Sequence, residues 1–281
     1  MPDKPHGAAD YSVDDTARSV RALLLLARVL GNELMGDVTL VGGLVPTLLV
    51  DPRADPPLTV AEKHCGTQDV DIAFSLAVLE DERYTAIAER LRRAGFAPDR
   101  SPADNPTRQR WICGQARVDF LIEPVGDRRA GIQSFDATFG AQIMRGLGLA
   151  FIDREEIRLT GTTLRDGDAA AVTIRVAGPG ALVILKGLAL AGRQEPKDAY
   201  DIVHTLRNWN GGTDDIAGRI TRLRGSHPEV VAEALATLRE RFASIDHAGP
   251  RQIARFLGTP DDDAVKQDAH GLVADLLRRV R

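Results

Sequence analysis

Thr67-Gln68-Asp69-Val70-Asp71-Ile72 is the segment from which the organisation of this chain is best worked out. Side chains alternate between the two faces of a β-strand, so Asp69 and Asp71 share one face of an otherwise apolar strand. Two neighbouring anions on such a strand are unfavourable unless a cation or water compensates them. The segment therefore predicts either a cation site or a solvated strand end.

A second apolar strand, Val118-Asp119-Phe120, carries a third carboxylate. Sheet pairing can bring Asp119 beside Asp69 and Asp71. Carboxylate oxygens are ligands that Mg²⁺ prefers in proteins. We therefore expect these three aspartates to be metal ligands, with Mg²⁺ or Mn²⁺ as the ion.

The pair Gly42-Gly43 follows the apolar residues Leu40-Val41 and precedes a helix expected at 44–50. Glycines let a phosphate approach the backbone closely, and N–H groups at a helix start can donate to it. Thr67 shares a face with Asp69, where its hydroxyl could bond a phosphate or the water shell of the metal. Many ordinary turns also use Gly-Gly, so this signal depends on the nearby aspartates. Together they suggest metal-assisted transfer from a nucleoside triphosphate.

Lys186 lies in an expected helix, 179–192, that is apolar almost all the way round. Such a helix should be buried, and a buried lysine needs a partner. A phosphate is one solution, a salt bridge to Asp198 or Asp201 is another, and the two are compatible. Arg193 follows two helical turns later on the same face.

Lys197-Asp198-Ala-Tyr-Asp201-Ile202 opens the next expected helix. Asp198 and Asp201 are three residues apart and can face the same side. Acidic residues in a first helical turn also stabilise the helix. A structural and a functional role are therefore equally compatible with this pair.

The composition, 43% hydrophobic and 27% charged residues among 281, is that of an ordinary soluble globular protein. A net charge of -4 argues against broad, non-specific nucleic-acid binding. Two cysteines make no disulfide framework, and we do not expect Cys65 and its neighbour His64 to form a nucleophile pair. The chain shows no signal-peptide pattern and no apolar run of membrane-spanning length. These features favour a cytoplasmic protein without a membrane partner.

The residue patterns predict an α/β (α+β) fold, a mixed sheet with helices followed by a helical C-terminal lobe. Strands are expected at 37–41, 69–74, 110–113, 115–122, 156–160 and 171–176. Helices are expected at 13–34, 80–95, 179–192, 196–208, 214–224, 228–243, 250–256 and 261–280. Loops are expected at 51–66 and 98–106. The expected domains are an α/β lobe at 1–178 and a helical lobe at 179–281.

These motifs resemble those of the nucleotidyltransferase superfamily, and most closely its AbiEii toxin group, also described as MenT-like. The first motif of that group joins Gly-Gly or Gly-Ser to Ser/Thr-x-Asp-x-Asp, matched here by Gly42-Gly43 and Thr67-Gln-Asp69-Val-Asp71. Its acidic residue on a later strand matches Asp119. A lysine and an arginine separated by six residues match Lys186 and Arg193, and basic-Asp-x-Tyr-Asp-Ile matches 197–202. The resemblance covers residues 35–208.

The resemblance implies a two-lobed fold that transfers a nucleoside monophosphate from a nucleoside triphosphate to a hydroxyl group, with Mg²⁺. The acceptor would be a tRNA, a protein or a small molecule, and an antitoxin protein would be a partner. Asp69 and Asp71 would be metal ligands, and Asp119 would be the third ligand or the base for the acceptor. Asp198 or Asp201 would assist the acceptor or hold the basic residues. Nucleotide-binding residues would be Gly42, Gly43, Thr67, Lys186, Arg193 and Lys197.

The chain departs from the family pattern in one place. The arginine that commonly precedes the aspartate motif is absent, and Gln68 occupies the intervening position, while Lys63 or Arg53 could substitute for it. A catalytically inactive binding or interaction protein with the same fold is the alternative to an enzyme. The retention of Asp69, Asp71, Asp119 and Lys186 favours the enzyme.

Overall fold

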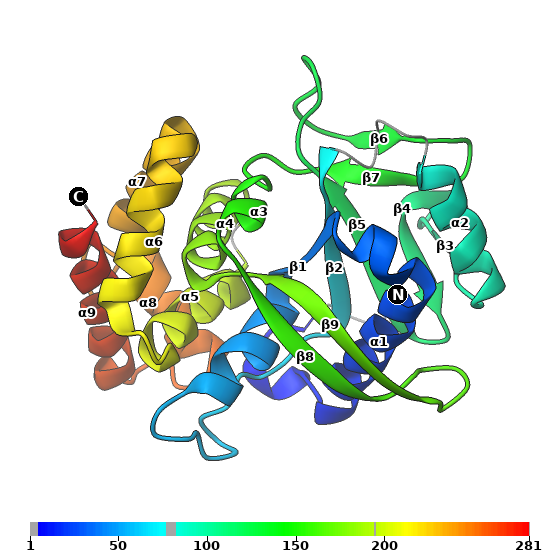
Figure 1. Ribbon diagram of the computed structural model, residues 1–281. Helices are drawn as coiled ribbons and strands as arrows, with labels where there is room; N and C mark the ends of the chain where they lie inside the picture. The colour runs from blue at the N-terminus through cyan, green and yellow to red at the C-terminus, as the bar shows by residue number, and fades with distance from the viewer. Residues whose placement is uncertain (1–4, 77–82, 194, 281) are drawn as a thin grey trace. The chain divides into compact units, whose positions relative to one another are not determined.

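The computed structural model describes residues 5–76, 83–193 and 195–280 (Figure 1). Contacts between residues group the chain into two compact units. The sheet unit takes the described residues of 13–44 and 67–177, and the helical unit takes those of 5–12, 45–66 and 178–280. The predicted fold class is confirmed, because the chain is mixed α/β with an open mixed sheet and a helical C-terminal region.

Among the described residues, nine strands form one sheet, and seven of them follow the order β3-β4-β5-β2-β1-β9-β8. Their bounds are β1 (Val38–Val41), β2 (Asp69–Phe74), β3 (Ala97–Arg100), β4 (Pro106–Cys113), β5 (Ala116–Ile122), β8 (Arg154–Thr162) and β9 (Ala169–Ala177). The other two strands pair with each other as β6 (Ile132–Ser134) and β7 (Gly140–Ile143), and β7 also pairs with β5. Since β2 is antiparallel to β1 and parallel to β5, the centre of the sheet is mixed.

One face of the sheet is an apolar core. The ring centroids of Phe74 (β2) and Phe120 (β5) stack 5.2 Å apart, and Phe139 meets both rings edge-on. The long helix α1 (Val13–Met35) packs against β2, β5, β8 and β9, and the shorter α2 (Arg83–Arg93) packs against α1. Because Phe74 lies on the core face, the alternation along β2 places Asp69 and Asp71 on the opposite face.

The helical unit is built from six α-helices within the described residues. They are α4 (Pro179–Gly192), α5 (Pro196–Asn208), α6 (Gly212–Ser226), α7 (Pro228–Arg241), α8 (Ala248–Phe256) and α9 (Asp263–Arg279). The buried helix α4 packs on α5, α6 and α7, which explains its apolar surface all round. No helix in the described part of the chain is both long enough and apolar enough to cross a membrane.

Two expectations about local structure need correction, and a third lies partly outside the described residues. The loop expected at 98–106 begins with an edge strand, Ala97–Arg100, which tolerates Pro98 because it pairs only with β4. The helix expected at 44–50 is instead a 3₁₀ turn, η2 (Gly42–Leu44), followed by a π-type turn, η3 (Pro46–Val50), that starts at a proline. The helix expected from residue 80 is found as α2 from Arg83, while residues 80–82 lie outside the described residues.

The loop expected at 51–66 contains a short 3₁₀ turn, η4 (Asp51–Arg53). Together with residues 45–50, where Leu49 and Val50 are fully buried, it makes up the segment 45–66. Its contacts place it in the helical unit, although its neighbours in sequence on both sides belong to the sheet unit.

Candidate functional site

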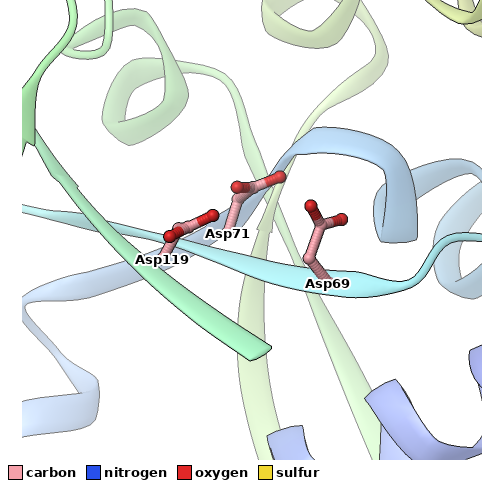
Figure 2. Close-up of side chains that lie close together, drawn as sticks. All are labelled: Asp69, Asp71 and Asp119. Carbon is pink, nitrogen blue, oxygen red and sulfur yellow. The ribbon is translucent and has the colours of Figure 1, made fainter. Parts of the chain in front are cut away.

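Three aspartates meet on the face of the sheet opposite the aromatic core. The parallel register of β2 and β5 sets Asp71 directly opposite Asp119, two residues after Asp69. One carboxylate oxygen from each residue lies within 4.8 Å of the others. Figure 2 shows the three carboxylates side by side above the two strands. In the described part of the chain, no other group of three or more His, Cys, Asp or Glu side chains converges in this way.

Arg110 is the cross-strand neighbour of Asp119 and forms a two-point ion pair with it. Its Nε and Nη2 donate to Oδ1 and Oδ2 of Asp119, each at 2.7 Å. Such a fork-to-carboxylate pair is among the strongest hydrogen-bonded ion pairs in proteins. Arg110 was not identified from the sequence, because only the β4–β5 register brings it to the acidic cluster. It supplies one positive charge beside three carboxylates.

Asp119 is the most buried member of the cluster. Burial raises the pKa of its carboxyl, the charge of Asp69 acts in the same direction, and Arg110 opposes the shift. In return, the hydrogen bonds to Asp119 raise the pKa of the Arg110 guanidinium, which stays charged. An additional positive charge at the cluster would therefore stabilise the ionised form of Asp119.

Gly42 comes very close to Asp71. Its φ is +77°, and a Cβ built on it would lie 2.8 Å from the Asp71 Cγ, closer than real Cβ contacts come. Any side chain at position 42 would thus displace the carboxylate. Gly43 follows in the buried part of η2. Gly42 is therefore required by the packing of the acidic cluster itself, whether or not a phosphate binds there.

Thr67 fixes the first aspartate of the cluster. Its hydroxyl donates to Oδ1 of Asp69 at 2.7 Å, and its backbone N–H donates to the Thr16 hydroxyl at 3.2 Å. Thr67 is buried, whereas Asp69 is only partly buried. The hydroxyl therefore orients a carboxylate that is itself accessible.

The donor atoms of the cluster fit a hard divalent cation. All three are carboxylate oxygens, which suit Mg²⁺ or Mn²⁺ and lack the Cys and His ligands typical of structural zinc sites. Both oxygens of Asp119 accept from Arg110, but each keeps a second lone pair. Asp69, Asp71 and Asp119 could therefore hold such an ion together.

The later motif residues form a second cluster, inside the helical unit. Lys186 Nζ on α4 lies 2.8 Å from Asp198 Oδ1 and 2.6 Å from Asp201 Oδ2 on α5. Arg193 binds both oxygens of Asp198, at 2.9 and 3.1 Å, and Lys197 Nζ lies 2.8 Å from Asp201 Oδ1. The two aspartates therefore link all five residues, and Lys186 adopts the salt-bridge alternative, with both aspartates as partners.

Charge pairing outweighs burial in this second cluster. Although burial opposes it, the charges of Asp201 and Asp198 raise the pKa of Lys186 above its usual value. Lys186 and Lys197 in turn hold the pKa of Asp201 well below its usual range, and Lys186 and Arg193 lower that of Asp198. These shifts favour the charged forms of Lys186, Asp198 and Asp201.

His64 also belongs to this cluster and was not linked to it by sequence. Its Nε2 lies 2.8 Å from Asp201 Oδ1, and its ring stacks on Tyr200 at a centroid distance of 5.2 Å. Burial lowers its pKa from 6.5 to about 4, with the Lys197 charge as the next cause. Burial likewise raises the pKa of the Cys65 thiol to about 11. The thiol is therefore protonated near neutral pH, consistent with the expectation that these neighbours form no nucleophile pair.

Two residues were proposed to replace the missing arginine. The Arg53 guanidinium lies 5.7 Å from the centroid of the Trp209 ring, within the helical unit, and Lys63 is exposed. Gln68 reaches toward Asp15 at 3.5 Å. The replacement of that arginine stays a prediction.

Comparisons of the chain with protein-family models, with curated proteins and with solved structures find no match.

Proposed function

We propose that this protein is a Mg²⁺-dependent nucleotidyltransferase that moves a nucleoside monophosphate from a nucleoside triphosphate to a hydroxyl acceptor. The observation that carries the proposal is the convergence of Asp69, Asp71 and Asp119 oxygens within 4.8 Å of one another. Three carboxylates held this close repel one another, and a bound cation would offset that repulsion. The resemblance of the motifs to nucleotidyltransferases of the AbiEii group supports the same reading.

The chain contributes ligands and orientation in this proposal. Asp69, Asp71 and Asp119 hold the cation, Thr67 orients Asp69, and Gly42 leaves room for Asp71. A divalent cation in such a site offsets the negative charge of a triphosphate and lowers the pKa of an attacking hydroxyl. Asp119 is the third ligand or accepts the hydroxyl proton. Its raised pKa favours proton acceptance over a free aspartate.

Lys186 and its partners contribute positive charge held at fixed positions. Nζ of Lys186 is held between Asp198 Oδ1 and Asp201 Oδ2. In this proposal its charge attracts an anionic ligand such as a phosphate. The side chain of Arg193 is 58% exposed while Asp198 holds it in place, so it suits the same role.

The acceptor class and the biological role extend this proposal. A hydroxyl of a tRNA, a protein or a small molecule is compatible with the chemistry, and the AbiEii resemblance favours a toxin controlled by an antitoxin protein. The overall charge of -4 disfavours an acceptor bound only by non-specific attraction to its phosphates.

One observation favours the alternative of an inactive protein with this fold. Both oxygens of Asp119 are already engaged by Arg110, so part of the charge of the cluster is balanced without a metal. A scaffold that had lost catalysis could persist with this ion pair. Metal binding separates the two possibilities.

The deciding experiment incubates the protein with each α-³²P-labelled nucleoside triphosphate, Mg²⁺ and cell extract, and identifies the labelled macromolecule. Asp71→Asn should abolish labelling, because it removes one ligand with little change in shape. Asp127→Asn, which alters an exposed aspartate of the same unit, serves as the matched control. Absence of labelling with all four triphosphates, together with no Mg²⁺-dependent rise in melting temperature, would favour the inactive scaffold.

A further inference from the structure

The segment 45–66 joins two parts of the proposed metal site through the helical unit. The chain leaves the sheet unit after Leu44, two residues past Gly42, and returns to it at Thr67, two residues before Asp69. Between these points its contacts are made within the helical unit. The position of this segment therefore affects the position of Leu44 and Thr67, the residues that flank it.

Buried polar bonds fasten both ends of the segment to helix α5. Near its start, Asp51 Oδ1 lies 2.7 Å from Nε2 of His204. At its end, His64 Nε2 lies 2.8 Å from Oδ1 of Asp201, and the Cys65 N–H donates to the Tyr200 hydroxyl at 3.1 Å. The side chains of His64 and Asp201 are fully buried. Water cannot readily replace these bonds, so breaking them leaves polar groups unsatisfied.

His64 also ties the two ends of the segment to each other. Its backbone N–H donates to Asp51 Oδ2 at 2.9 Å, and its Nδ1 lies 3.2 Å from the Thr47 hydroxyl. The Gly66 N–H donates to the same Nδ1 at 3.0 Å. Since a backbone N–H can only donate, Nδ1 is the acceptor and the ring proton is on Nε2, directed at Asp201.

We infer that His64 is a positioning residue for the proposed metal site, acting through Gly66 and Thr67 on Asp69. Gly66, held by the His64 ring, is joined by one peptide bond to Thr67, whose hydroxyl donates to Asp69 at 2.7 Å. His64 itself touches neither metal nor nucleotide. Its effect on metal affinity rests on the proposed function, whereas its effect on the order of the chain at Thr67 does not.

The test compares His64→Leu, which keeps the bulk but loses all three ring hydrogen bonds, with His64→Gln, whose amide can still donate to Asp201 and accept from the Gly66 N–H. His247→Leu changes an exposed histidine of the same unit and is the matched control. Amide hydrogen exchange is measured at residues 67–70, and Mn²⁺ affinity is measured by titration. In His64→Leu we expect about tenfold faster exchange at 67–70 and about tenfold weaker Mn²⁺ binding. His64→Gln should recover much of both, and His247→Leu should match the wild type.

Wild-type exchange at 67–70 in His64→Leu would overturn the inference, because a histidine that only stabilises the helical unit would leave these amides unchanged. If His64→Leu fails to fold, His64→Asn decides instead, since its shorter amide can still accept from the Gly66 N–H but cannot reach Asp201. The inference expects near-wild-type exchange at 67–70 in that variant, and about tenfold faster exchange would overturn it. Absence of Mn²⁺ binding by the wild type would contradict the proposed function instead, and the exchange measurement would still decide the role of His64.

Discussion

Arg110 and Asp119 hold each other by two parallel hydrogen bonds of 2.7 Å at the edge of the acidic cluster. The guanidinium is a counter-charge in direct contact with one of three convergent carboxylates. Its positive charge reduces the repulsion among the three carboxylates, as a bound cation would. The ion pair and a bound metal are therefore partly interchangeable as sources of positive charge.

Arg110→Gln should destabilise the metal-free protein more than the Mg²⁺-loaded protein. Its side chain is 37% exposed, so solvent screening limits the loss in free energy of unfolding to about 1–2 kcal/mol without metal. A bound cation replaces the lost charge and should reduce that difference. Thermal melts of both proteins with and without Mg²⁺ measure it. An equal loss in both conditions would show that no cation shares the charge of Arg110.

Asp69→Asn should abolish Mg²⁺-dependent stabilisation and nucleotide transfer while leaving the metal-free fold intact. The amide oxygen of asparagine can still accept from Thr67, and the loss of one negative charge relieves repulsion from Asp119. We expect the metal-free free energy of unfolding to stay the same or to rise by about 0.5–1 kcal/mol. Chemical denaturation with and without Mg²⁺ measures both effects. A sharp fall in metal-free stability would identify the carboxylate as structural.

Gly42→Ala should disrupt the acidic cluster, whereas Gly114→Ala should not. Both glycines have positive φ, +77° and +58°, so each substitution carries a backbone cost of about 1–2 kcal/mol. At Gly42 the new Cβ also overlaps the Asp71 carboxylate, while at Gly114 no atom lies within 4 Å. The free energy of unfolding is measured for both variants. Subtracting the loss found for Gly114→Ala from the loss found for Gly42→Ala isolates the steric effect of the overlap with Asp71. Equal Mg²⁺ stabilisation in the two variants would mean that the position of Asp71 is unimportant.

Some elements of the fold and of the candidate site were predictable from sequence, and others were not. Helices α4 and α5 have the bounds expected for them, Pro179–Gly192 and Pro196–Asn208, because a first-turn proline and a long apolar or amphipathic pattern are local signals. Strand β3 was missed because Pro98 and its charged neighbours resemble a loop, and only pairing with β4 makes it a strand. Local pattern carries no information about such pairing.

The same limit explains which site residues were found. Asp69 and Asp71 share a strand face by simple alternation, so their proximity follows from sequence. Arg110 and His64 reach their partners through strand register or through contacts with α5, at sequence separations of 9 and 137 residues. The expected strands at 110–113 and 115–122 did carry a signal for Arg110, because a two-residue turn at Gly114-Gln115 sets Cys113 opposite Ala116 and hence Arg110 opposite Asp119. A lone histidine in a loop has no pattern that would distinguish it from a solvated residue.

The stability of the protein should fall as the pH is lowered from about 6.5 toward 4, because of His64. Burial and the charge of Lys197 lower its pKa from 6.5 to about 4, while Asp201 opposes the shift and His204 adds to it. The unfolded chain therefore binds a proton in this window that the folded protein does not, and unfolding becomes more favourable. The loss is on the order of 3 kcal/mol at most across the window. The lowered pKa values of Asp198 and Asp201 act only below it.

Denaturation at neutral and mildly acidic pH, with wild type and His64→Gln, measures this dependence. Glutamine does not titrate, so the variant should lose the part of the slope that His64 contributes. His247→Gln, at an exposed site, should keep the wild-type slope. If the free energy of unfolding depends on pH equally in wild type and His64→Gln, His64 is not the titrating group.

Lys186→Met should destabilise the helical unit, because it removes the cation shared by two buried aspartates. The side chains of Asp198 and Asp201 are 2% and 0% exposed, and breaking such a buried arrangement costs about 3 kcal/mol. The double variant Lys186→Met/Asp198→Asn removes one of the stranded charges and should recover about 1 kcal/mol or more, since the exposed Arg193 tolerates the loss of its partner. Lys266→Met, at an ion pair with Asp263, should keep the wild-type melting temperature.

Chemical denaturation gives the free energies of unfolding, and transfer activity is then compared at a temperature where every variant is folded. If Lys186→Met is as stable as wild type, the ion pairs do not hold α4 to α5. If it is destabilised but retains full activity when folded, Lys186 serves the fold and not the triphosphate.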